Sequence, residues 1–133
     1  MLAVTSYPQD YIDHCRTLID AQLQAYGQLA ERPQPFETLF CNNMVLVLEL
    51  SFVHRLRKNE GKDGNPLNEV RLLASSILEH GGVLVADKQI KLTPDTSVLG
   101  LSPGDRIELE FDGVKRLAAA FFDELERRCA TPA

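Results

Sequence analysis

The stretch from Phe36 to Lys58 constrains the fold most, because it is apolar on nearly every side of a helix. Large apolar residues recur every four positions and fill most of the positions between, as the following set shows: Phe36, Phe40, Met44, Val45, Leu46, Val47, Leu48, Leu50, Phe52 and Val53. Such a helix is central and must be enclosed by other elements. The β-branched content also permits a buried strand over residues 44–53, but the four-residue spacing extends beyond strand length and favours a helix. Arg55, Arg57 and Lys58 are expected to close it, since cations suit a helix C-terminus.

Two amphipathic helices are predicted at the ends of the chain. The first runs from about Tyr7 to Glu31, and Ser6 with Gln9 has the spacing of a capping box at its start. The last begins near Asp112. Each carries one apolar stripe at steps of three and four residues, which predicts packing on the central helix.

A third amphipathic helix is predicted from the best local signals in the chain. Asn65 is a favourable N-cap, Pro66 suits the first helical position, and Gly81-Gly82 is a typical stop. Between this helix and the last, residues 83–111 alternate apolar and polar positions, with turn residues between the runs. The sequence therefore predicts a mainly α fold: a four-helix antiparallel bundle with a small β-hairpin or three-stranded β-flap inserted before the last helix.

Length and composition favour a single cytoplasmic domain spanning residues 1–133. A net charge of −5 argues against extensive binding of duplex nucleic acid. The longest apolar run is too short to span a bilayer, the N-terminus lacks a signal-peptide pattern, and no membrane association is expected. Three widely spaced cysteines, Cys15, Cys41 and Cys129, predict reduced and buried thiols.

The polar segment around residues 55–71 is the candidate ligand-binding site. Its cations surround a helix N-terminus, which presents free backbone donors to an anion. The candidate residues, including one histidine beyond the segment, are Arg55, Lys62, Asp63, Asn65, Asn68, Glu69, Arg71 and His80. The acidic members offset the cations, and their spacing does not match an EF-hand. The same residues would also serve as a solvated, well-capped helix connection, so the sequence leaves both interpretations open.

Two polar positions, Asn42 and Glu49, interrupt the central helix and are candidate buried polar residues. They predict a polar groove that takes a small molecule, a structural buried hydrogen-bonded pair, or a side of the helix turned to solvent. His14, His54 and His80 fall on separate elements, so no metal site is predicted. The chain lacks a Gly-x-Ser-x-Gly elbow and a Walker loop, and neither catalytic residues nor a cofactor is expected.

Residues 65–128, with the helix that ends at His80-Gly-Gly, the stretch Gly104-Asp-Arg-Ile-Glu-Leu and a closing helix, resemble the C-terminal half of HEPN-superfamily proteins. That resemblance implies a small helical bundle, often dimeric, and a ribonuclease site built from an Arg-x(4–6)-His motif. Here Arg71 and His80 are nine residues apart, which departs from the motif. The stretch Gly61 to Arg71 also resembles a family of small actinobacterial helical-bundle proteins, and this likeness implies no activity.

The leading hypothesis is a non-catalytic, homodimeric module that binds a protein partner or an anionic ligand near residues 55–71. The first alternative is a HEPN-like ribonuclease or toxin–antitoxin component that uses Arg71 and His80 on RNA. The second is a bundle that binds a small molecule around Glu49.

Overall fold

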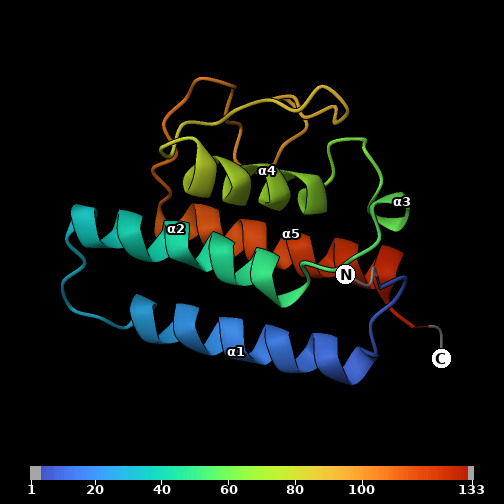
Figure 1. The fold of residues 1–133 in the computed structure, drawn as a ribbon. Coiled ribbons are helices and arrows are strands. Elements are labelled where there is room, and N and C mark those ends of the chain that lie inside the picture. Colours follow the sequence, from blue (N-terminus) through green and yellow to red (C-terminus); the bar gives the residue numbers. More distant parts are fainter. Residues whose placement is uncertain (1–3, 132–133) are drawn as a thin grey trace.

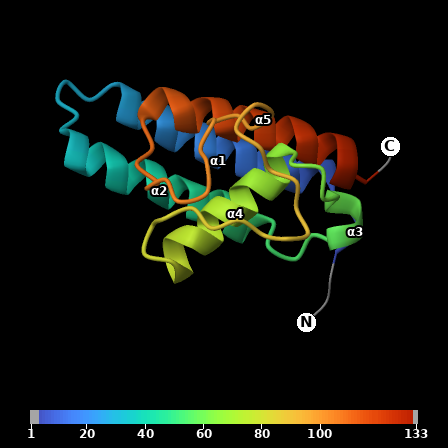
Figure 2. The ribbon, with the colours of Figure 1, turned by 90° about the horizontal axis from the view of Figure 1, so that it is seen from above.

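The computed structural model describes residues 4–131, which form five helices and no β-strand. The helices are α1 (Gln9–Gly27), α2 (Gln34–Ser51), α3 (Arg57–Glu60), α4 (Pro66–Glu79) and α5 (Phe111–Cys129). Figure 1 shows α2 and α5 side by side in a middle layer, with α1 on one side and α4 on the other. Viewed from above, α4 crosses the middle layer diagonally (Figure 2).

The helices form a bundle that matches the predicted antiparallel arrangement only loosely. α2 and α5 are neighbours that run in the same direction, while α1 and α4 run opposite to them (Figure 1). The connection between α4 and α5 is long, because it crosses to the end from which α4 started and then returns, so that α5 begins near the end of α4 (Figure 1). An up-and-down bundle would need a short turn there.

The predicted β-hairpin or three-stranded β-flap over residues 83–111 is wrong. The segment, which we call the extended segment, runs across α4 with turns at residues 88–89, 94–96 and 103–104. Its only ladder contact is an isolated antiparallel bridge between Val83 and Arg106. Ile107 and Leu109 are buried while Glu108 between them is exposed. The period-two pattern therefore indicates that one side of this stretch is buried. It does not indicate that the stretch pairs with a neighbouring strand.

Asn42 of α2 takes the place of that neighbouring strand. Its Nδ2 donates to the carbonyl oxygen of Ile107 at 2.9 Å, and its Oδ1 accepts from the backbone N–H of Leu109 at 3.3 Å. A side-chain amide offers one donor and one acceptor in the same orientation as a peptide group. Asn42, which interrupts the apolar pattern of α2, thus anchors the extended segment.

Two predicted helix ends also need correction. α2 ends at Ser51, so residues 52–58 do not continue it, and Arg57 with Lys58 belongs to the separate short helix α3. At the start of α1 the capping residue is Pro8, and no side-chain cap forms there, so the Ser6–Gln9 capping box is wrong. In contrast, Asn65 caps α4 as predicted.

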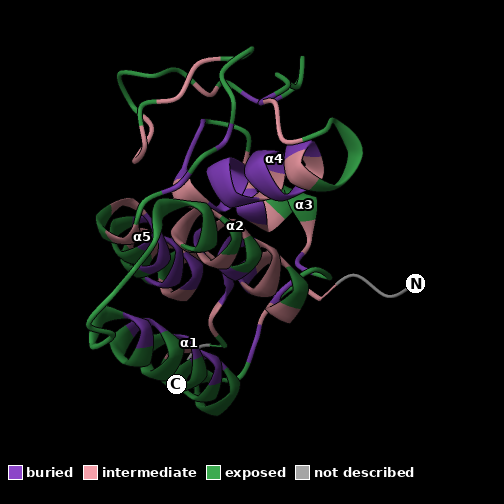
Figure 3. Cartoon of the chain, turned by 90° about the vertical axis from the view of Figure 1, so that its left-hand side faces the viewer, coloured by how far each residue is buried: buried purple, intermediate pink, exposed green. Residues whose placement is uncertain are grey.

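The core lies between the three layers, where the inward sides of the long helices are buried (Figure 3). At one end, Phe52 packs edge-on against Tyr7, with ring centroids 5.0 Å apart, and against Phe122 at 5.9 Å. Cys15, Cys41 and Cys129 are buried free thiols, as predicted. Burial raises the pKa of Cys41 to about 11, which keeps this thiol protonated and unreactive.

Gly64 permits a close approach between the turn before α4 and the extended segment. Its φ is +84°, and a side chain there would overlap the carbonyl oxygen of Lys91. Next to it, the Lys91 N–H donates to the carbonyl oxygen of Lys62 at 2.9 Å. Only glycine satisfies both the backbone conformation and the contact.

Candidate functional site: a buried charge cluster and its groove

Glu60, the last residue of α3, is completely buried and lies at the centre of a charge cluster. Nη2 of Arg71 donates to its Oε1 at 2.6 Å, and Nδ2 of Asn68 donates to its Oε2 at 2.7 Å. Nε of Arg55 lies 2.9 Å from Oε1, an ion-pair distance, although its N–H is not directed at that oxygen. The carboxylate therefore faces two guanidinium groups.

Arg55 is also fully buried, and its remaining donors are used inside the protein. They donate to the carbonyl oxygens of Phe52 at 3.1 Å and Leu67 at 3.0 Å. Nη2 of Arg55 also lies 2.9 Å from Oε1 of Glu49. We call Glu49, Arg55, Glu60 and Arg71 the charge cluster. Its two acids balance its two bases, so burying it leaves no net charge inside the protein.

The surroundings of Glu60 lower its pKa. Burial alone would raise the pKa, but the hydrogen bonds from Arg71, the charge of Arg55 and the amide of Asn68 outweigh it. The carboxylate is therefore ionised in the folded protein at neutral pH.

The lowered pKa of Glu60 predicts a specific pH dependence of stability. The stabilisation that this carboxylate contributes is fully present above its unfolded-state pKa of about 4.3, and it is lost as pH falls through the lower folded-state pKa. We expect Glu60→Gln to lower the free energy of unfolding at pH 7 and to make it less sensitive to acid than in the wild type. Urea unfolding at several pH values between neutral and acidic measures, for each protein, the slope of the free energy of unfolding against pH. Parallel slopes in the two proteins would contradict the assignment.

The loop between α3 and α4 is held in place by hydrogen bonds among its own residues and by contacts with α5. Oδ1 of Asn65 accepts from Leu67 N at 2.8 Å, while its Nδ2 donates to the carbonyl oxygen of Glu60 at 2.8 Å. From α5, Arg128 donates to the same carbonyl at 3.0 Å and pairs with Asp63 at 3.0 Å. Hydrogen bonds from Asn65 and Arg128 lower the pKa of Asp63. These contacts make the loop a structural connection.

Four of the predicted site residues converge on Glu60: Arg55, Asn65, Asn68 and Arg71. Sequence reasoning did not single out Glu60 as a site residue, because it ends a charged run that is typical of a solvated turn. Glu49, Glu60 and Arg71 lie on three different helices and Arg55 lies between two of them, so the convergence is a product of tertiary packing.

The other predicted site residues lie elsewhere. Glu69 faces the extended segment, where it accepts from the N–H groups of Val98 at 2.7 Å and Leu99 at 3.0 Å. His80 follows the last residue of α4 and is exposed, about 13 Å along the helix axis from Arg71. Lys62 is exposed on the loop, where its carbonyl oxygen contacts Lys91. A single ligand site containing all eight residues does not form within one chain.

A groove of about 350 Å³ opens along the outer edge of the charge cluster, between α2, α3, α4 and residue 87. It is lined by Glu49, Arg57, Arg71, Leu72, Ala74, Ser75, Leu78, Glu79 and Asp87. At its inner end, Nη1 of Arg71 lies 3.7 Å from Oε2 of Glu49, which is too far for a hydrogen bond. The hydrogen bonds of Arg71 within residues 4–131 use only Nε and Nη2. Nη1 is therefore free to donate to a group in the groove.

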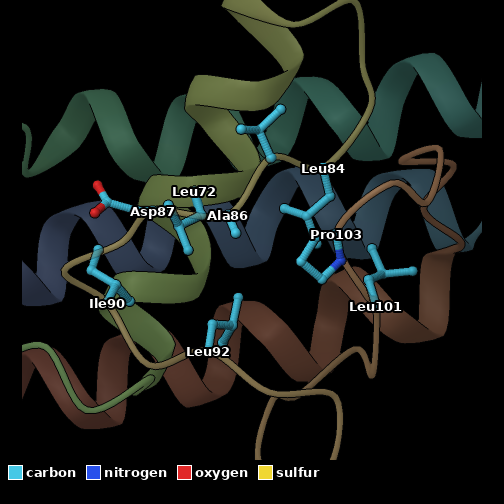
Figure 4. Close-up of a pocket in the computed structure, with 9 residues that line it drawn as sticks. Leu72, Leu84, Ala86, Asp87, Ile90, Leu92, Leu101 and Pro103 are labelled. Carbon is cyan, nitrogen blue, oxygen red and sulfur yellow. The ribbon is translucent and has the colours of Figure 1, made fainter.

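A second hollow lies between α4 and the extended segment, and Leu72 and Asp87 line both it and the groove (Figure 4). Its volume is about 20 Å³, and the side chains of Leu72, Ile90 and Leu101 are among those that line it. A space of that size holds about one water molecule. Its lining includes the exposed residues Ala86, Asp87 and Pro103, and it is too small for an organic ligand.

Within the part of the chain that the structure describes, no three His, Cys, Asp or Glu side chains are grouped to hold a metal ion. None of the helices there is both long and apolar enough to cross a membrane. No protein-family model, curated protein or solved structure matches the chain.

Proposed function

We propose that the protein is a non-catalytic binding module that takes a peptide segment of a partner protein in the groove beside the charge cluster. One observation carries this proposal: Nη1 of Arg71 and Oε2 of Glu49 lie together at the inner end of the groove, and neither is satisfied by a hydrogen bond within residues 4–131. A peptide unit offers one carbonyl acceptor and one N–H donor, which are the groups that this pair needs.

The lining supports a peptide better than a small anion. Two cations, Arg57 and Arg71, meet three carboxylates, Glu49, Glu79 and Asp87. A phosphate group would therefore face more negative than positive charge. The apolar side chains of the lining suit the side chains of an extended partner segment, and the buried half of the charge cluster holds the inner end rigidly.

The alternatives drawn from the sequence receive less support. A HEPN-like ribonuclease needs Arg71 and His80 at one site, but the guanidinium of Arg71 is held by Glu60 and the two residues lie far apart along α4. A small-molecule site around Glu49 would occupy the same groove.

Ser75 supplies a hydroxyl to the lining of the groove, and none of the hydrogen bonds in residues 4–131 joins it to a base. Hydrolytic chemistry needs that contact.

Peptide display on the purified protein tests the proposal. We expect the selected peptides to bind Ser75→Arg, which fills the groove, at least about tenfold more weakly than the wild type. Thr17→Arg makes a comparable change on the exposed side of α1 and should bind with unchanged affinity. Millimolar inorganic phosphate should neither bind nor compete. Equal binding to both variants, competition by phosphate, or failure to select any peptide would each overturn the proposal.

A further inference from the structure

The outward side of α2 carries an apolar pattern that is the same in both directions along the helix. We call it the α2 face, and it consists of Phe36, Leu39, Phe40, Asn43, Leu46, Val47 and Leu50. The six apolar residues lie three, four and seven positions before and after Asn43. Leu39 is 70% exposed and Leu50 is 72% exposed. Phe40, Leu46 and Val47 are half-buried and also pack against the core, while Phe36, Leu39 and Leu50 are exposed.

The apolar surface continues onto α1. Tyr11, Leu18, Gln22 and Ala25 of α1, with Leu29 just after it, recur at steps of three, four and seven on the side beside α2. The two helices meet in an apolar hollow that Ala25, Leu29, Phe36 and Phe40 help to line. None of these α1 residues or of the α2 face is charged, although charged residues make up 25% of the chain. Loss of charge around exposed apolar side chains is typical of an interface core.

We propose that a second copy of this chain covers the α2 face, with the two α2 helices antiparallel and a two-fold axis beside Asn43. A two-fold interface brings the same surface of both copies together, so its pattern must be complementary to itself. The spacing meets that condition, because Phe36 then lies opposite Leu50, Leu39 opposite Val47 and Phe40 opposite Leu46. Asn43 lies opposite its own counterpart, where each amide can donate to the other.

The available area is sufficient for such a dimer. α2 has 18 residues and is therefore about 27 Å long. Together with α1 at a usual helix spacing it presents a face about 20 Å wide. Two copies would bury on the order of 1,100 Å² in total, just above the roughly 1,000 Å² expected of a biological interface.

Charge favours a copy of the chain over a membrane as the occupant. Helices that bind anionic lipid surfaces carry Lys or Arg along the borders of their apolar side, and this surface has neither. Each copy has a net charge of −5, so two copies repel unless they meet through an uncharged surface. The lone Asn43 within an apolar stripe is also the kind of residue that fixes helix register at a cost in affinity.

Sedimentation equilibrium tests whether the α2 face is the interface. We expect the wild type to have twice the 14.9 kDa mass of the chain at micromolar concentration and Leu50→Glu to have the single-chain mass with unchanged helix content. Leu78→Glu is the matched control, because Leu78 is 71% exposed on α4 outside the face, and it should remain dimeric. A monomeric wild type, a dimeric Leu50→Glu, or binding of the wild type to phosphatidylserine vesicles would each overturn the proposal.

Crosslinking tests the antiparallel register. A short bis-maleimide should join two Asn43→Cys chains, because the two-fold axis places these positions next to each other. The three native cysteines are buried, so they do not compete for the reagent. Thr17→Cys, on an exposed side of α1, should stay uncrosslinked. A dimer that is not crosslinked through position 43 would refute this register. Binding of the selected peptides in the groove should be unaffected by Leu50→Glu, so the two proposals fail separately.

Discussion

Replacing Glu60 by alanine is expected to lower the free energy of unfolding by about 3–5 kcal/mol, the cost of removing one partner from a buried ion pair. The substitution leaves Arg55, which is fully buried, next to an empty space where its counter-charge was. It also removes the acceptor of Arg71 and Asn68. Chemical denaturation followed by circular dichroism, at one protein concentration, measures the loss.

Two comparisons separate this effect from a general effect of losing a carboxylate. Asp123→Ala removes a partner of Arg16 that is 74% exposed, and an exposed pair contributes about 1 kcal/mol or less. The double variant Arg55→Met/Glu60→Leu replaces the buried pair by apolar groups, and it should be more stable than Glu60→Ala. If Glu60→Ala unfolds with nearly the free energy of the wild type, the cluster does not hold the loop and α4 in place.

Replacing Phe52 by alanine is expected to cost about 3–5 kcal/mol, which is the usual loss for a buried phenylalanine. Phe52 is fully buried immediately after α2, and its ring contacts the rings of Tyr7, Tyr11, Phe121 and Phe122 at centroid distances of 5.0 to 5.9 Å. These rings come from the N-terminal segment, α1 and α5. The cavity therefore weakens the contacts of three elements at once. Thermal and denaturant unfolding measure the loss.

A large apolar residue on the surface provides the control for Phe52. Leu78→Ala changes a side chain that is 71% exposed, and a surface substitution of that kind is usually within about 0.5 kcal/mol of the wild type. The loss of unfolding free energy for Phe52→Leu should lie between those of Leu78→Ala and Phe52→Ala, since leucine leaves a smaller cavity than alanine. A loss of less than about 1 kcal/mol for Phe52→Ala would mean that the aromatic residues repack around the gap.

The proposed peptide groove and the proposed dimer interface occupy separate parts of the surface. The groove lies along the α4 side of α2, and the face lies on its outward side next to α1. A dimer formed through the face leaves both grooves open. Two copies could then bind two segments of one partner, which raises the apparent affinity without any new contact.

The sequence predicted those features that depend on neighbouring residues. Asn65 and Pro66 start α4 because both act on the first turn of the helix that follows them. The central position of α2 follows from its apolar circumference, and its inward side, including Met44 and Leu48, is buried. The three cysteines are buried because small apolar thiols favour the interior.

Features that depend on distant residues were decided only by the tertiary structure. The sequence predicts that Arg55 closes an apolar helix. In the structure Arg55 lies beyond the end of α2, and it is buried because Glu60 and Glu49 supply opposite charge. Residues 83–111 alternate as a strand does, but alternation specifies one buried face and not a pairing partner. The apolar pattern of α2 specified a helix enclosed on all sides. Within one chain its outward side stays exposed, because α1 and α4 cover only its flanks.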